Sequence, residues 1–97
     1  MKIIINHNKY AGFIPTRVYS VRGERDDEAD AVGVYASSPD EAAETWAEWI
    51  DGEDGEVRPE QIAIVNLKEK GWRWRVKVTA ETIVEYRGDA EEEKDSQ

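Results

Sequence analysis

Four carboxylates at helical spacing form the most regular charged pattern in the chain. They are Glu41, Glu44, Glu48 and Asp51, at intervals of three, four and three residues. Because residues three and four apart share one face of an α-helix, this spacing predicts an acidic stripe about 15 Å long. One charge per about 5 Å, against about 3.4 Å per phosphate along one DNA strand, makes such a helix a sparse imitation of a nucleic-acid backbone. An ordinary solvated helix face has the same pattern.

A second acidic block continues from the stripe. The segment 51–56 reads Asp-Gly-Glu-Asp-Gly-Glu and adds the carboxylates of Glu53, Asp54 and Glu56. It lacks the regular alternation and the closing Glu of a calcium-binding loop, so no metal site is predicted. The seven carboxylates together are the candidate partner-binding residues, because a contiguous anionic surface could occupy a basic groove that otherwise takes DNA or RNA.

A basic stripe supplies the alternative function. Arg73, Arg75 and Lys77 alternate with Trp72 and Trp74. Bases stack on aromatic rings and cations neutralise phosphates, which would favour a small nucleic-acid-binding module. In a strand, however, alternate side chains point to opposite faces, so the tryptophans cannot form a stacking platform beside the cations. A stripe of this kind usually pairs with neighbouring acids, and a net charge of −9 weakens general affinity for nucleic acid, so direct binding is not expected.

The residues needed for most catalysis are missing or isolated. The chain has no cysteine, and its single histidine, His7, stands between two asparagines without a second imidazole. Its seven glycines are scattered and form no phosphate-binding loop. Its carboxylates cluster in polar segments, whereas acid–base catalysis needs one of a pair in an apolar pocket. The sequence therefore predicts no enzyme activity, no cofactor, no metal and no small-molecule substrate.

Charge is distributed unevenly along a chain that is long enough for one domain. Its 97 residues carry a net charge of −9, with 39% apolar residues to build a core. Residues 24–60 contain fourteen acidic and two basic side chains, and the rest of the chain contains eight acidic and eleven basic ones. Such polarity steers oppositely charged partners. The longest apolar run, Ile3 to Ile5, is far shorter than a membrane span, so a cytoplasmic protein is expected.

One helix is predicted at about 39–51. Ser38 has the position of an N-cap, Pro39 that of the first helical residue, and Glu41 that of the reciprocal partner in a capping box. Gly52 is the expected left-handed stop. The apolar stripe at three- and four-residue spacing comprises Ala42, Ala43, Trp46, Trp49 and Ile50. This stripe is typical of a helix face that packs on a core.

Strand patterns surround the helix. Residues 17–22 and 31–37 predict a hairpin around the acidic loop 23–30, and residues 61–67 and 72 onward predict a second hairpin across 68–71. The alternation after residue 72 is too long for one straight strand, so a bend or turn is expected near 79–82. Residues 2–6 could add an edge strand. The fold class predicted is α+β, with an antiparallel sheet of four to five strands and one helix on one face, in β-β-α-β-β order.

The domain boundary is expected near residue 87. The segment 88–97 has no apolar residue larger than alanine, so it cannot offset the entropy of ordering and is predicted to be a disordered acidic tail. Residues 1–87 would then form the single globular domain.

A family resemblance rests on the segment Val34-Tyr-Ala-Ser-Ser-Pro-Asp-Glu-Ala-Ala-Glu-Thr-Trp-Ala-Glu-Trp-Ile50, in which a strand leads into a Ser-capped helix. With the small size, the acidity and the lack of cysteine, this segment resembles small accessory proteins of bacteriophages and mobile elements, anti-CRISPR proteins among them. The resemblance covers residues 17–87 and is one of architecture and composition. It implies a stoichiometric inhibitor in the host cytoplasm that occludes a basic, nucleic-acid-handling host complex, with no catalytic residues.

Three functional hypotheses follow. The first is a non-enzymatic, DNA-mimic-like inhibitor that acts through the helix acids and the adjoining loop. The second is the nucleic-acid-binding module that uses the basic stripe. The third is a structural component that oligomerises through an edge strand. A monomer or a small homo-oligomer agrees with the sequence in each case.

Overall fold

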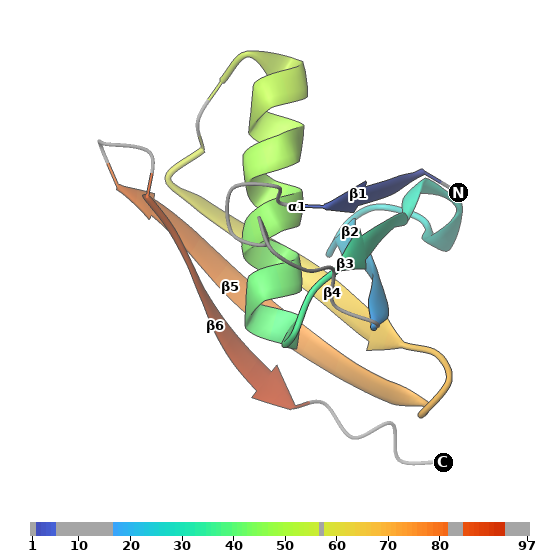
Figure 1. The fold of residues 1–97 in the computed structure, drawn as a ribbon. Helices are drawn as coiled ribbons and strands as arrows, with labels where there is room; N and C mark the ends of the chain where they lie inside the picture. The colour runs from blue at the N-terminus through green and yellow to red at the C-terminus, as the bar shows by residue number, and fades with distance from the viewer. Residues whose placement is uncertain (1, 6–16, 57, 82–84, 93–97) are drawn as a thin grey trace.

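In the part of the chain that the structure describes, six β-strands form one sheet and a single α-helix crosses one of its faces (Figure 1). The computed structural model describes residues 2–5, 17–56, 58–81 and 85–92. The elements are β1 (Ile3–Ile5), β2 (Val18–Gly23), a 3-10 turn (Glu28–Asp30), β3 (Val32–Tyr35), α1 (Pro39–Asp54), β4 (Glu60–Leu67), β5 (Trp72–Glu81) and β6 (Glu85–Glu92). The α+β class with one helix is thereby confirmed. In the described part of the chain, no helix has the length and apolarity that crossing a bilayer requires.

The sheet is mixed, which corrects the prediction of four to five antiparallel strands. Its order is β1-β3-β2-β4-β5-β6, and both predicted hairpins are present, as β2–β3 and β4–β5. The edge strand β1 instead runs parallel to β3, with Ile3 opposite Gly33. A run of three apolar residues has no alternation that sets its partner or its direction, so the sequence could not show this pairing.

The start of α1 follows the predicted capping pattern with one shift. The hydroxyl of Ser38 accepts a hydrogen bond from the backbone N–H of Glu41 at 3.2 Å. The carboxylate of Glu41 reaches back to the N–H of Ser37, at 3.2 Å, rather than to that of Ser38. The first-turn N–H of Glu41 and the N–H of Ser37, which precedes the N-cap, are satisfied in this way.

The helix ends three residues later than predicted. Gly52 lies inside it, and Gly55 is the residue that adopts the left-handed conformation, with φ of 70°. The N–H of Gly55 donates to the carbonyl of Asp51, which closes the last turn. Both glycines suit a helix stop by residue type, and the contacts of the last turn with the rest of the fold decide between them.

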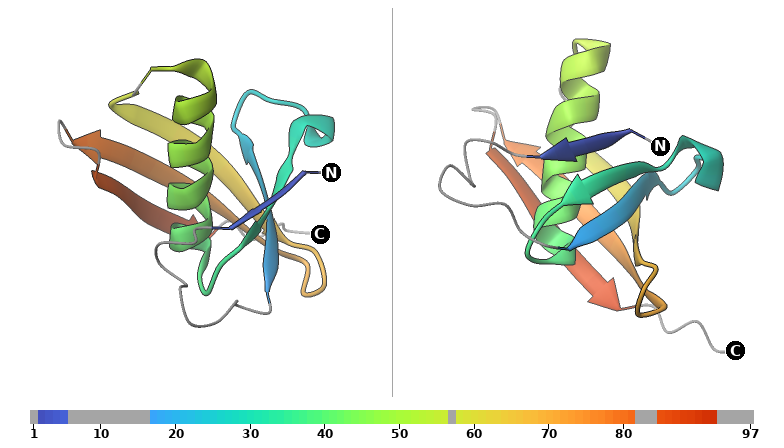
Figure 2. Two further views of the ribbon diagram at one scale, coloured as in Figure 1. Left: turned by 45° about the horizontal axis from the view of Figure 1, so that its top comes forward. Right: turned by 45° about the vertical axis from the view of Figure 1, so that its right-hand side comes forward.

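The core lies between α1 and the sheet. Trp46 is 3% exposed and is the largest core side chain on the helix. Trp49, its expected companion, is only partly buried against this core. The largest fully buried side chains of the core come from the sheet and are Tyr19, Val21, Val34, Val65, Leu67, Val76 and Val78. In the left-hand view of Figure 2, β5 and β6 lie on one side of α1 and β1–β3 lie on the other.

The strand β6 corrects the predicted boundary at residue 87. The strand β5 continues through Glu81, beyond most of the region 79–82 where a bend or turn was expected, and β6 pairs with it in antiparallel register, with the residues from Gly88 to Glu92 included. Strand pairing uses backbone groups, so a segment without large apolar side chains can still join a sheet. Gly88 also lets the backbones approach, since a Cβ there would lie 2.9 Å from the carbonyl oxygen of Asp40. Residues 93–97 of the predicted tail lie outside the described residues.

Candidate functional site

Two carboxylates of the acidic stripe of α1, Glu44 and Asp51, bind groups on β6. Glu44 accepts a hydrogen bond from the backbone N–H of Gly88 at 2.8 Å. Glu41 caps the helix, and both of these glutamates are partly buried. Of the four stripe carboxylates, only Glu48 is exposed. Three of the four stripe carboxylates, Glu41, Glu44 and Asp51, therefore accept hydrogen bonds from other parts of the fold.

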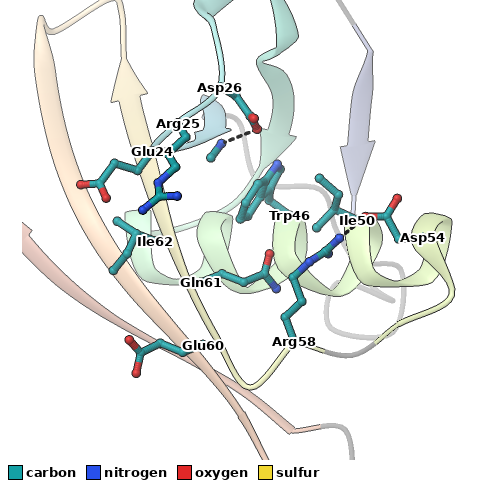
Figure 3. A pocket seen from close by; sticks show the side chains of 11 residues that line it. Glu24, Arg25, Asp26, Trp46, Ile50, Asp54, Arg58, Glu60, Gln61 and Ile62 are labelled. Carbon is teal, nitrogen blue, oxygen red and sulfur yellow. Dashed lines mark hydrogen bonds and ion pairs between the residues drawn. The ribbon is translucent and has the colours of Figure 1, made fainter.

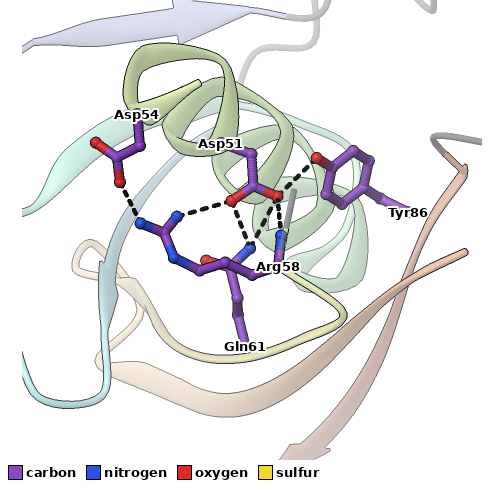
Figure 4. A network of polar contacts seen from close by, with 5 residues as sticks. All are labelled: Asp51, Asp54, Arg58, Gln61 and Tyr86. Atoms are coloured by element: carbon purple, nitrogen blue, oxygen red, sulfur yellow. Dashed lines mark hydrogen bonds and ion pairs between the residues drawn. The ribbon is translucent and has the colours of Figure 1, made fainter. Parts of the chain in front are cut away.

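Asp51 is the centre of a buried polar network, which corrects its assignment to a partner-binding surface (Figure 4). It is 3% exposed. Its carboxylate accepts hydrogen bonds from the phenol of Tyr86 at 2.7 Å, from Nη1 of Arg58 at 2.8 Å and from the amide of Gln61 at 3.1 Å. The backbone N–H of Arg58 donates to it as well, at 3.2 Å. A carboxylate enclosed by these donors cannot reach another molecule, because the fold already occupies it.

The electrostatics of the network favour one protonation pattern. Burial, and then the hydrogen bond to Asp51, raise the pKa of Tyr86 to about 12, so its phenol stays neutral and donates. The hydrogen bond to Asp54 is the main reason why the pKa of Arg58 lies above its ordinary value. The network therefore ties the end of α1 to β4 and β6 through a charged pair and a neutral phenol.

Asp40, at the start of α1, is a further carboxylate that the fold partly buries. Burial raises the pKa of Asp40 above its ordinary value, and the neighbouring charge of Asp89 on β6 raises it further. The fold thus disfavours the ionised form of Asp40. This end of the helix adds little to an exposed acidic surface.

The basic stripe lies on the sheet face opposite α1 and is matched by acids. Nε of Arg75 lies 2.7 Å from Glu24, and Nζ of Lys77 lies 3.3 Å from Glu60. The hydrogen bond from Arg75 lowers the pKa of Glu24 below its ordinary value. Arg73 is half-buried on the same face. Pairing with acids reduces the positive potential that phosphate binding would need.

A hollow opens between the second half of α1 and the connection from β2 to β3 (Figure 3). Its volume is about 630 Å³, and Trp46, Ile50 and Ile62 supply its apolar surface. A smaller hollow of about 390 Å³ adjoins it, with Val32 and Trp49 in its wall. The two hollows share the lining residues Asp26, Trp46, Ile50 and Asp54, and together they form what we call the helix–loop groove.

The walls of the helix–loop groove bring together two acidic blocks that are far apart in the sequence. Asp26 and Asp30 come from the β2–β3 connection, and Glu53 and Asp54 come from the end of α1. Glu53 and Asp54 were candidate residues from the sequence, and Glu56 is exposed beyond them without lining either hollow. The acids of 24–30 were visible as a charged block, but nothing in the sequence placed them opposite α1.

The described residues show no cluster of three His, Cys, Asp or Glu side chains that could hold a metal ion, and His7 lies outside them. The chain matches no protein-family model, and searches of curated proteins and of solved structures also found no match.

Proposed function

We propose that this protein is a non-enzymatic binding module that docks onto a basic surface of another protein through the acidic walls of the helix–loop groove. The observation that carries the proposal is the convergence of Asp26 and Asp30 with Glu53 and Asp54 around one hollow. These four carboxylates concentrate negative potential around a hollow that also has apolar lining residues. A site with both features can bind and orient a basic partner.

The charge balance of the groove supports this direction. Six carboxylates line the two hollows, against the three cations Lys2, Arg25 and Arg58, and two of the six, Glu24 and Glu60, pair with Arg75 and Lys77 of the basic stripe. Asp27 and Glu28 are exposed in the same connection, beside the groove. The ion pair of Arg58 with Asp54 and that of Lys2 with Glu53 involve partly exposed side chains, so a partner can exchange with them at small cost.

The partner in this proposal is a nucleic-acid-handling complex of a host cell, whose basic groove the acidic walls occupy in place of DNA or RNA. This follows the resemblance to phage-encoded inhibitors of the anti-CRISPR kind. The docking surface differs from the helix stripe predicted from the sequence, since Glu44 and Asp51 are engaged within the fold. Binding of this type depends on salt, mainly through the rate of association.

A pull-down with and without nuclease tests the proposal. Tagged protein is incubated with bacterial lysate, and retained proteins and nucleic acids are both identified. The test variant is Asp30→Lys with Glu53→Lys, and the control is Glu69→Lys with Glu91→Lys, which changes the net charge equally at exposed positions away from the groove.

The expected result is a nucleic-acid-handling protein that survives nuclease, is lost with the test variant and is kept by the control. Equal loss with both variants would show that only net charge matters and would refute the groove assignment. Retention of nucleic acid, with all proteins released by nuclease, would favour the module built on Arg73, Arg75 and Lys77 instead.

A further inference from the structure

One of the chain's own cations, Lys2, lines the smaller hollow. Nζ of Lys2, which precedes β1, lies 5.1 Å from the ring centroid of Trp49. The same ammonium lies 3.8 Å from the carboxylate of Glu53. The side chains of Lys2 and Glu53 are 61% and 55% exposed, so both are accessible to a partner. A ring face and a carboxylate together form a site for a cationic side chain.

The other residues that line the smaller hollow also offer apolar surface and carboxylates. Val32 and Ile50 offer apolar surface, and Asp26 and Asp30 add carboxylates at the side formed by the β2–β3 connection. A lysine or arginine side chain has an apolar stem, which can pack on the apolar surface, and a charged head, which can pair with the carboxylates. At about 390 Å³, the hollow has room for a side chain of this size.

We infer that a lysine or arginine side chain of the partner's basic surface enters this hollow and displaces the ammonium of Lys2 from Trp49 and Glu53. The inference rests on the proposed function and adds the side chain that is recognised. Lys2 then acts as an internal competitor, since its ammonium must leave the ring before the partner's cation can take its place. A partner cation that reaches Asp26 and Asp30 as well gains contacts beyond those that Lys2 makes with Trp49 and Glu53.

The experiment titrates the full chain with amide-capped hexa-arginine at low salt and follows the indole N–H signals in ¹H–¹⁵N spectra. Hexa-glutamine, which lacks charge, is the control peptide. The signal of Trp49, assigned from the Trp49→Leu variant, is expected to shift. The signal of Trp72, which is 50% exposed on β5, is expected to stay in place.

Four variants test the named contacts. Trp49→Leu and Glu53→Gln should each weaken binding of hexa-arginine at least threefold, whereas Glu69→Gln, with the same change at the β4–β5 turn, should leave it within twofold. Lys2→Gln should strengthen binding by about twofold or more, because the competing ammonium is gone. Lys2 and Glu53 are exposed, so these two variants remain informative even if Trp49→Leu disturbs folding.

The outcomes separate this inference from the proposed function. If hexa-arginine binds but Trp49→Leu and Lys2→Gln change nothing, the recognised side chain is wrong and the acidic docking surface stands. If hexa-arginine does not bind while a basic protein is captured in the pull-down, the inference is overturned in the same way. If hexa-arginine binds and shifts Trp49 but no basic protein depends on Asp30 and Glu53, the proposed function fails.

Discussion

Replacing Asp51 by alanine tests whether the buried network holds the end of α1 on the sheet. The substitution removes the acceptor for the phenol of Tyr86, for the amide of Gln61 and for the backbone and side chain of Arg58. Gln61 is 9% exposed, so its amide has little access to solvent. The guanidinium of Arg58 keeps Asp54 and is partly exposed, and it loses less.

The magnitude follows from these donors. A buried donor left without a partner costs about 1–3 kcal/mol, and Asp51→Ala leaves three donors without their acceptor: the phenol of Tyr86, the amide of Gln61 and the backbone N–H of Arg58. We therefore expect Asp51→Ala to lower the free energy of unfolding by about 3–5 kcal/mol, a large share of the roughly 5–15 kcal/mol typical of a domain. At a slope of about 1–3 kcal/mol per M urea, the unfolding midpoint falls by at least about 1 M.

Urea unfolding at pH 7, followed by tryptophan fluorescence and by circular dichroism, measures this change. Asp54→Ala is the matched control, because Asp54 lies on the same helix and binds the same Arg58 but is 46% exposed. Its expected cost is about 0–1 kcal/mol. A cost below about 1 kcal/mol for Asp51→Ala, or equal costs for the two variants, would refute the reasoning that burial makes this carboxylate structural.

Three further predictions concern stability. Gly52→Ala should raise the unfolding free energy by about 0.5–1 kcal/mol, because Gly52 lies within α1 with open space for a Cβ. Gly88→Ala should lower the unfolding free energy by about 1–3 kcal/mol, because its Cβ would lie 2.9 Å from the carbonyl oxygen of Asp40. Urea unfolding of both variants checks these opposite signs. Ser38→Ala should cost about 1 kcal/mol through loss of the N-cap, and an unchanged unfolding midpoint would contradict the capping role. Since the pKa of Tyr86 is raised to about 12, its stabilising effect is complete below about pH 10 and is lost as pH rises through 12, so the melting temperatures of the native chain and Tyr86→Phe should converge over that range.

The sequence alone predicted only part of the candidate site. Helical spacing and the alternation around Trp74 are local patterns, and each led to the correct type of element. Such local patterns could not predict which acids would stay exposed to a partner. Glu48 and Asp51 lie three residues apart on one helix, yet the first is exposed and the second is 3% exposed, because Asp51 lies within hydrogen-bond distance of Tyr86 on β6.

Local chemistry determined the helix start, the two hairpins and the face of α1 that packs on the core. Ser38 as N-cap, the positive φ of 71° at Gly71 and the period-two alternation after Trp72 each act within a few residues, so the sequence alone sufficed for them. Tertiary structure decided the direction of β1, the inclusion of residues 88–92 in β6 and the end of α1 at Gly55.

The same division applies to the helix–loop groove. The acids of 24–30 and 51–56 are separated by β3 and most of α1, and only the packing of the helix across the sheet brings Asp30 and Glu53 to one hollow. Contacts between segments so distant along the chain depend on the whole fold, because no local pattern encodes which two surfaces will meet. Residue types and local spacing therefore determined which charges this protein carries, and the tertiary structure decided which of them stay available for a partner.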